Sequence, residues 1–291
     1  MNTSPDSLQR FLFEHAPVRG EIVQLEQTWL SVLQRHDYPQ VLRDIMGELC
    51  AAAVLLAATL KLQGSLILQI HGKGAIKLLV VECSGNLELR ATAKWVGELA
   101  HGTLAELVGE GRFVITLDPK DGNQPYQGIV ALEGSSVAEM LQNYMERSEQ
   151  LETRLWLAAD GGRAAGMLLQ KLPAQQHDDD TWSRLNHLAA TVTAQELLSL
   201  PPQEVLRRLF HEEDVRVFEP QEVSFNCTCS RANVARMLKL LGQEEVDSVL
   251  EEQGEIEVFC EFCNERYIFD AIDARAVFVD ALLGDGRGTR H

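Results

Sequence analysis

The spacing of hydrophobic residues changes from helical to strand-like along the first part of the chain. Apolar residues recur every three or four positions at 21–34 and again from Pro39 to about Lys61, which predicts two helices. A further helix is predicted at 137–148. Helices gathered at one end of a run of strands predict an α+β domain with packed helices and a mostly antiparallel sheet. The predicted strands, which are β-branched or alternating and separated by glycines, are 66–70, 76–82, 87–95, 112–118, 126–133, 154–159 and 166–171.

Two amphipathic segments follow a boundary at Pro173 and the acidic run His177–Asp180. Their apolar residues recur at helical spacing on either side of Pro201 and Pro202. Each helix is too short to bury its own apolar face, so both are predicted to pack against a neighbouring domain. The simplest interpretation of this segment alone is a packed linker without a switching role. The apolar residues are Trp182, Leu185, Leu188, Ala189 and Val192, then Val205, Leu206, Leu209 and Phe210.

The last part of the chain combines short helices and short strands. Residues from Val223 to Cys227 alternate as in a strand. Helices are predicted at 231–241 and 244–252, stopped by Gly242 and Gly254. Two further strands are predicted at 255–259 and 266–270. We therefore expect an N-terminal α+β core at 1–176, a helical linker at 177–222, a small C-terminal domain at 223–283 and a flexible tail at 284–291.

Composition and charge narrow the possible partners. The chain has 291 residues, 45% of them hydrophobic and 24% charged, as in ordinary globular proteins. Its net charge is -17, and residues 174–291 hold 23 acidic against 11 basic residues, so we expect no nucleic-acid partner. The uncharged run Leu49–Leu60 is shorter than the roughly 20 residues of a membrane helix, and no secretory signal is visible. A cytoplasmic protein without a membrane partner is predicted.

Four of the six cysteines form two close pairs, Cys227-Thr228-Cys229 and Cys260-Glu261-Phe262-Cys263. Thiols stay reduced in the cytoplasm, where clustered cysteines indicate metal or redox chemistry. Zinc prefers four tetrahedral ligands and binds thiolates well, and a Cys-x-x-Cys turn between strands chelates one ion. We therefore predict one Zn²⁺ bound by these four cysteines. The remaining two, Cys50 and Cys83, stand alone among apolar residues and are predicted to be buried, inert thiols.

The predicted zinc site has two interpretations. It is either a ribbon that only stabilises the C-terminus or a switch that responds to oxidation. In small domains the binding of a structural zinc contributes about 10–16 kcal/mol of apparent free energy. If each pair closed on itself, the disulfides would span very short loops and would no longer connect residue 227 to residue 263. The small domain should then unfold, and linker helices resting on it would lose their support.

The cysteine motifs belong to a longer pattern that we recognise. Phe225-x-Cys227-x-Cys229-Ser-Arg and Gly254-Glu-Ile-Glu-x-x-Cys260-x-x-Cys263-Asn resemble the zinc-centre signature of the redox-regulated heat-shock chaperones, the 33 kDa chaperonin family. The resemblance covers nearly the whole chain in the same order. Further matching stretches are His36-Asp-Tyr-Pro39, Tyr126-Gln-Gly-x-Val-x-Leu-Glu-Gly134, Arg147-Ser-Glu-Gln-Leu151, Met167-Leu-Leu-Gln170 and Glu245-Val-Asp-Ser248.

The resemblance implies a protein that is not an enzyme but a holdase, which binds unfolding client proteins without ATP. It implies an inactive, zinc-bound reduced monomer. It also implies that oxidation forms the disulfides Cys227–Cys229 and Cys260–Cys263, after which zinc leaves, the linker unfolds and a homodimer forms. For client binding we expect the apolar faces that linker release exposes, formed by Trp182, Leu185, Leu188, Val192, Val205, Leu209 and Phe210.

Two other functions remain as alternatives. Cys260 and Cys263 could serve a thiol–disulfide oxidoreductase, although such motifs usually lie at a helix N-terminus and the flanks here predict strands. A zinc ribbon that binds nucleic acid is disfavoured by the acidic C-terminal part. No other catalytic constellation is visible in the sequence.

Overall fold

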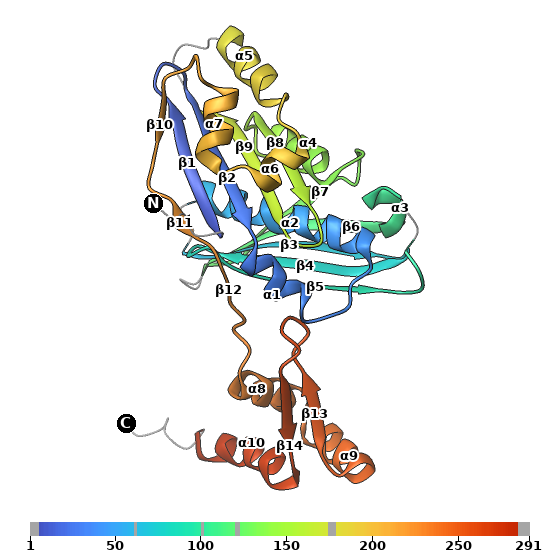
Figure 1. Cartoon of the computed structure of the whole chain (residues 1–291). Coiled ribbons are helices and arrows are strands. Elements are labelled where there is room, and N and C mark those ends of the chain that lie inside the picture. The colour runs from blue at the N-terminus through green and yellow to red at the C-terminus, as the bar shows by residue number, and fades with distance from the viewer. Residues whose placement is uncertain (1–5, 61–62, 100–101, 120–122, 174–178, 285–291) are drawn as a thin grey trace, which may run out of the picture. The chain divides into compact units, whose positions relative to one another are not determined.

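The computed structural model describes residues 6–60, 63–99, 102–119, 123–173 and 179–284 (Figure 1). The chain forms two compact units, Met1–Asn226 and Cys227–His291. The first unit therefore includes the linker segment and continues to Asn226, directly before Cys227. The predicted boundary at 176 and nearly all of the predicted tail lie outside the described residues.

Two six-stranded sheets form the framework of the first unit. The first sheet has the order β10-β1-β2-β9-β8, with β11 also paired to β1, and the second has the order β12-β5-β4-β3-β6-β7. Within the described residues, the pairings in both sheets are antiparallel except for the parallel pair β12–β5. This confirms the predicted α+β class with mostly antiparallel sheet.

The bounds of these strands and of the helices that accompany them follow in chain order. The strands are β1 (Ser7–Phe13), β2 (Val18–Leu25), β3 (Gly64–Gly72), β4 (Ile76–Ser84), β5 (Glu88–Trp95), β6 (Gly111–Pro119), β7 (Tyr126–Val130), β8 (Thr153–Ala159), β9 (Ala164–Lys171), β10 (Val215–Val217), β11 (Gln221–Glu222) and β12 (Ser224–Phe225). The helices are α1 (Gln27–Leu33), α2 (Gln40–Thr59), α3 (Leu104–Val108), α4 (Val137–Arg147), α5 (Asp179–Ala189), α6 (Ala194–Ser199) and α7 (Pro202–Leu209).

Helix α2 lies between the two sheets and forms the centre of the main core (Figure 1). It contacts strands of both sheets, and its residues from Leu49 to Leu55 are completely buried. This stretch of the helix is uncharged and apolar on all sides, so it has no face to present to water. The prediction that the run Leu49–Leu60 belongs to a core helix is confirmed up to Thr59, where the helix ends.

The predicted helix at 21–34 is wrong in its first half, and strand β1 was not predicted. Residues up to Leu25 form β2, and the helix α1 begins at Gln27. The cause is burial on both faces: Ile22 packs under the linker helices, whereas Val23 and Leu25 face the main core. A strand covered on both sides loses the alternation of polar and apolar residues that identifies a strand in a sequence.

The linker helices α5, α6 and α7 cover the outer face of the first sheet (Figure 1). The single helix expected to end before Leu200 is two helices. Thr193 caps the start of α6, because its hydroxyl accepts a hydrogen bond from the backbone N–H of Glu196 and its own N–H donates to the Glu196 carboxylate. Packing against a neighbouring domain was predicted correctly. The expectation that the C-terminal domain provides that support is wrong, because the apolar faces rest on Phe11, Phe13 and other sheet residues of the first unit.

The C-terminal unit is built of α8 (Arg231–Leu241), α9 (Gln243–Gln253), β13 (Ile256–Phe259), β14 (Arg266–Phe269) and α10 (Ala271–Gly284). Helix α10 was not predicted, although Asp270 caps its start by accepting hydrogen bonds from two backbone N–H groups. The core of this unit is small. Its buried residues, up to Phe278 where the described side chains end, are Leu238, Val246, Ile256, Phe269 and Ala274.

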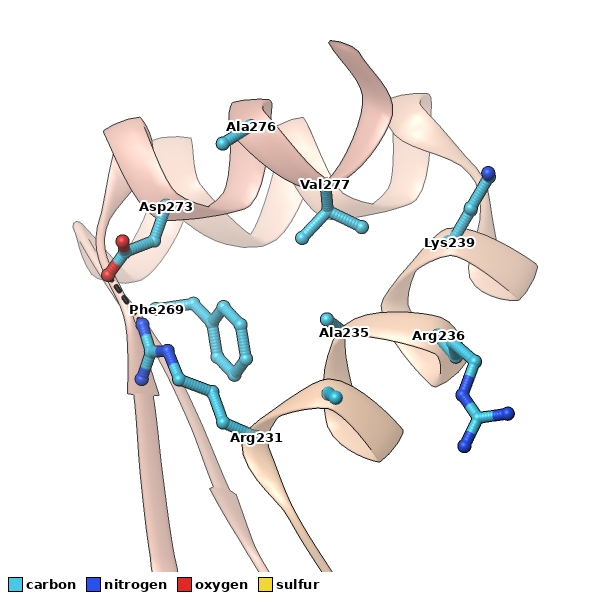
Figure 2. Close-up of a pocket in the computed structure, with 9 residues that line it drawn as sticks. Arg231, Ala235, Arg236, Lys239, Phe269, Asp273, Ala276 and Val277 are labelled. Atoms are coloured by element: carbon cyan, nitrogen blue, oxygen red, sulfur yellow. Dashed lines mark hydrogen bonds and ion pairs between the residues drawn. The ribbon is translucent and has the colours of Figure 1, made fainter. Parts of the chain in front are cut away.

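Arg231 joins three elements of the C-terminal unit (Figure 2). Its guanidinium donates to Asp273 Oδ2 at 2.6 Å and to the backbone oxygen of Ile268 at 2.7 Å, and it lies 4.2 Å from the centre of the Phe269 ring. An open pocket of about 480 Å³ lies beside it between α8 and α10. Since Arg231 begins α8, these contacts fix that helix against β14 and α10.

We expect Arg231→Ala to destabilise the C-terminal unit by about 1–2 kcal/mol, because charge-assisted hydrogen bonds and a cation–π contact are lost together. Amide hydrogen exchange of residues 256–269 in the full chain measures this effect as faster exchange. Arg236→Ala is the matched control, since Arg236 lies on the same helix and bonds to Asn233 of that helix. Equal exchange in the two variants would contradict the assigned role.

Candidate metal centre

The first cysteine pair lies in the connection between β12 and α8. Asn226 still donates to the backbone of β5, at Leu89, and Ser230 caps α8 by accepting from the N–H of Asn233. The Asn233 side chain donates to the backbone oxygen of Thr228 at 2.8 Å, which fixes the residue between the two cysteines. The pair was expected to lie in an extended strand, but β12 ends at Phe225, and a capped loop positions both thiols instead.

The second cysteine pair lies in the turn between β13 and β14, as the sequence predicted. The backbone N–H of Cys260 donates to Glu265 at 2.9 Å, and that of Asn264 donates to Cys260 at 2.8 Å. Asn264 has a φ of 57°, a left-handed conformation that asparagine tolerates better than most residues. These bonds close the turn so that the side chains of Cys260 and Cys263 point to the same side.

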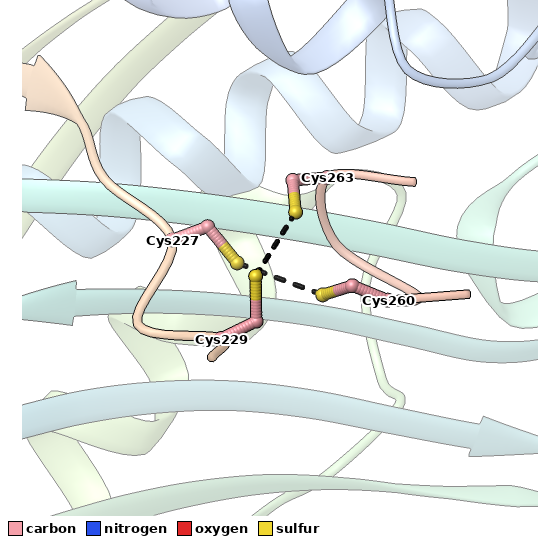
Figure 3. Close-up of side chains that lie close together, drawn as sticks. All are labelled: Cys227, Cys229, Cys260 and Cys263. Carbon is pink, nitrogen blue, oxygen red and sulfur yellow. Dashed lines mark hydrogen bonds between the residues drawn. The ribbon is translucent and has the colours of Figure 1, made fainter. Parts of the chain in front are cut away.

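The four sulfurs meet in one cluster (Figure 3). Each Sγ lies within 4.8 Å of the others, and the thiols are half-buried. Two contacts join the two pairs: Cys227 Sγ to Cys260 Sγ is 3.6 Å, and Cys229 Sγ to Cys263 Sγ is 3.3 Å. A tetrahedral Zn²⁺ with metal–sulfur bonds of about 2.3 Å requires sulfur–sulfur separations of about 3.8 Å. The cluster therefore has the donor set and the dimensions of a tetrathiolate metal site.

The electrostatics of the cluster favour a bound cation. Burial raises the pKa of the Cys263 thiol, the Glu265 backbone N–H lowers it, and hydrogen bonds with the neighbouring thiols raise it further. Crowded thiols disfavour the charged form because each new thiolate repels the others. A divalent cation reverses this balance, since its charge stabilises the thiolates that bind it.

Tyr267 is a residue of the site that the sequence analysis missed. Its phenol O–H donates to Cys229 Sγ at 3.1 Å, from a position on β14 opposite Val258 of β13. No motif identifies it, because the contact joins residues that are 38 positions apart. The hydrogen bond links the hairpin that carries the second pair to a sulfur of the first pair.

The two remaining cysteines are completely buried in the first unit, as predicted. Burial raises the pKa of Cys83 to about 12 and raises that of Cys50 still further above its ordinary value. Both thiols are therefore protonated at neutral pH and react slowly with oxidants.

The seven residues predicted to bind clients share one apolar cluster between the linker helices and the first sheet. The ring centre of Phe210 lies 5.0 Å from that of Phe13 in an edge-to-face arrangement. Whether these residues bind clients stays a prediction. Those that are buried are Trp182, Leu185, Val205, Leu209 and Phe210, and those that are partly buried are Leu188 and Val192.

Polar contacts also hold the linker on the sheet. The Gln24 side chain of β2 donates to the backbone oxygens of Leu197 and Leu200 at 2.8 and 2.6 Å, where α6 ends. Gln9 of β1, which is 1% exposed, accepts a hydrogen bond from Gln203 of α7 at 3.1 Å. Buried amides fix the position of a helix more strictly than apolar contacts do, because their bonds are directional.

Among the described residues, no helix has both the length and the hydropathy to cross a membrane.

Comparison with known proteins agrees with this geometry. The chain is 55% identical to the 33 kDa chaperonin of Methylobacillus flagellatus, over 98% of this chain and 99% of that protein. It is also 55% identical to the 33 kDa chaperonin of Chromobacterium violaceum, over 98% of both chains. The crystal structure of the 33 kDa chaperonin from Thermotoga maritima has the same fold, with a TM-score of 0.82 at 23% identity over 95% of this chain and 99% of that one. The family model described as Hsp33 protein matches residues 6–270. These matches over nearly the whole chain show that the protein belongs to the Hsp33 family of chaperones.

Proposed function

We propose that this protein is an ATP-independent holdase that is inactive while its four clustered cysteines bind Zn²⁺ and active after their oxidation. Membership of a family whose relatives are named chaperonins supports a chaperone function rather than an enzymatic one, with unfolded proteins as partners. The observation that supports the redox proposal is the cluster of four thiols, in which sulfurs of the two pairs lie in direct contact. The Hsp33 resemblance and the absence of basic runs make nucleic acid and membranes poor alternatives.

Zinc is the ion that best suits the site, because tetrahedral coordination by four thiolates is typical of structural zinc. When bound, it would connect the loop of Cys227 and Cys229 to the hairpin of Cys260 and Cys263. Among the described side chains of this unit, five form its buried apolar core, and so small a core depends on such a connection for its stability.

Oxidation would remove that connection. Two thiolates and one peroxide form one disulfide and two hydroxide ions, which is a two-electron oxidation of each pair. We propose the pairing Cys227–Cys229 and Cys260–Cys263, as the family resemblance implies. Both disulfides would be local, and neither would join the first pair to the second.

The segment between α7 and Cys227 provides a route from the cysteines to the linker. It is held to the first unit by three edge strands, β10, β11 and β12, which contain two or three residues each. Such short edge pairings open at small free-energy cost. We propose that loss of order in the C-terminal unit frays these strands and then releases α7, α6 and α5 from the sheet.

Release of the linker would uncover apolar surface for clients. The helix residues predicted to bind clients and the sheet residues beneath them, including Phe11, Phe13 and Met167, would be exposed together. Such surface also favours self-association, which agrees with the proposed homodimer of the oxidised protein. A cytoplasmic location is proposed because the switch requires thiols that are reduced at rest.

The test compares the zinc-loaded reduced protein with the same sample after treatment with peroxide at raised temperature. We expect the release of about one zinc per chain, a loss of helical circular dichroism and suppression of the aggregation of a model client. Disulfide mapping by mass spectrometry then identifies the pairing. Equal client protection before and after oxidation would refute the switch. Catalytic turnover of a test disulfide would favour the oxidoreductase, which the hairpin position of Cys260 and Cys263 disfavours.

A further inference from the structure

A pair of charged side chains is enclosed beside the segment that leads from the linker to the cysteines. Glu21 of β2 is 2% exposed, and its Oε1 lies 3.8 Å from Arg10 Nε of β1, which is too long for a hydrogen bond. Glu21 Oε2 and Arg10 Nε are both buried, and neither has a hydrogen-bond partner among the described residues. Such an enclosed pair destabilises the state that encloses it, because the hydration of the two groups is lost and only partly replaced.

The connecting segment (residues 211–226) forms one wall of this enclosure. Its strand β10 lies beside β1, and β1 lies beside β2 (Figure 1). Arg10 is paired with Glu21 across β1 and β2, and on the other side of β1 its backbone oxygen accepts from the N–H of Phe218 at 3.0 Å. All three residues line one cavity of about 380 Å³, and Phe218 is the described lining residue that the connecting segment supplies. Lifting the segment would therefore remove a wall of the cavity and give water access to the pair.

Few other charges act on Glu21. Among the described residues that line the cavity, the charged ones are Arg10, Arg19 and Glu21 itself, whereas those from α2, from the loops beside it and from the connecting segment are uncharged. Leu168, the partner of Glu21 on β9, is apolar. Burial raises the pKa of Glu21 from 4.5 to about 7, although Arg19 and Arg10 act to lower it. Once water reaches the carboxyl, its pKa moves back toward the ordinary value.

We propose that the enclosed Arg10–Glu21 pair weakens the docking of the connecting segment and couples its release to the loss of a proton from Glu21. When the segment lifts, water hydrates both groups and the proton passes to solvent. The contribution of Glu21 therefore favours docking most below about pH 4.5, weakens as the pH rises to about 7, and changes little above that, where the carboxyl is ionised in both states. The inference deepens the proposed release of the linker and rests on it for its consequence, which is that the pair keeps the resting protein close to release.

The first experiment follows the opening of the segment in the zinc-loaded, reduced full chain. Amide exchange of residues 214–223 is measured at about pH 6 and about pH 8 and divided by the exchange rate of unfolded peptides, which removes the intrinsic effect of pH. We expect the opening constant to rise about 3- to 10-fold between the two, because a carboxyl whose pKa falls on release ionises in this range. Glu21→Gln keeps the size of the side chain but cannot titrate, so its rise is expected to stay below about twofold.

Histidines beside the segment require a control. Histidine ordinarily changes charge near neutral pH, and the exposed His15 and His211 lie 3.0 Å from Asp214 and 3.9 Å from Glu212. The double variant His15→Gln/His211→Gln removes both rings. It is expected to retain the rise of the unchanged protein, because Glu21 is still present.

A second variant tests whether the pair weakens docking. Arg10→Met combined with Glu21→Leu replaces both charges by apolar side chains and leaves neither partner behind, a change that is often stabilising for a buried ion pair. We expect the opening constant at about pH 8 to fall by at least about 5-fold. We also expect the linker of this variant to be released only at a higher peroxide concentration.

Two results would overturn the inference: a rise with pH in Glu21→Gln equal to that of the unchanged protein, or an apolar pair that opens as fast as the charged one. Zinc content and client protection are measured on the same samples. Exchange in the reduced protein does not require chaperone activity, so the expected exchange without client protection after peroxide contradicts the proposed function alone. Client protection that appears on oxidation while opening is independent of pH contradicts the role of the pair alone.

Discussion

Cys260→Ser is expected to lower the zinc affinity of the full chain by more than about 100-fold and to unfold the C-terminal unit. Zinc in small domains contributes about 10–16 kcal/mol of apparent binding free energy, and most of it depends on a complete ligand set. The part of this unit whose side chains the structure describes has five buried apolar residues, and so small a core cannot replace that contribution. Serine matches cysteine in shape but binds zinc weakly, so the loss reports on coordination and not on packing.

Two measurements check this prediction. The zinc content per chain should fall to near zero under a competing chelator, and amide exchange should become fast throughout residues 231–284 while it stays slow in α2. Cys83→Ala is the matched control, since Cys83 is a completely buried cysteine of the first unit. A Cys260→Ser protein that retains zinc and a protected hairpin would show that the four sulfurs do not form one metal site.

The second sheet could be predicted from the sequence because its strands keep a clear period. Along β5, the apolar residues Leu89, Ala91 and Ala93 alternate with polar ones and belong to the main core. The first sheet is different, since β1 and β2 are covered by the main core on one side and by the linker on the other. Its edge strands β10 and β11 have three and two residues, too few for any period to show.

The cluster of four cysteines could be predicted because the chemistry of a thiolate metal site depends on residue type and spacing. The turn that holds Cys260 and Cys263 was correctly predicted to lie between two strands. The presence of four clustered cysteines was enough to indicate four thiolate donors. Tyr267 and Gln24 could not be predicted, because each acts through a contact between residues that are distant in sequence. Helix α10 was visible in principle, since Ala274, Val277 and Phe278 have helical spacing after the capping Asp270.

Phe210→Ala is expected to release the linker without oxidation and to give the reduced, zinc-bound protein holdase activity. Phe210 is 2% exposed, and its ring packs on Phe13 at 5.0 Å and on Phe11 at 6.1 Å between ring centres. Truncating a buried phenylalanine costs about 3–5 kcal/mol. This loss acts on the docking of α7 to the sheet, because the ring contacts of Phe210 are with β1.

The expected result is faster amide exchange in residues 194–210, an unchanged zinc content, and suppression of client aggregation under reducing conditions. Phe218→Ala is the matched control, because Phe218 follows in the same segment but its side chain is 42% exposed. If Phe210→Ala exposed the linker without protecting the client, linker release would not suffice for activity, and the client surface would have to lie elsewhere. If protection appeared while zinc stayed bound, the cysteines would act on client binding only through the linker, as the edge strands between α7 and Cys227 lead us to expect.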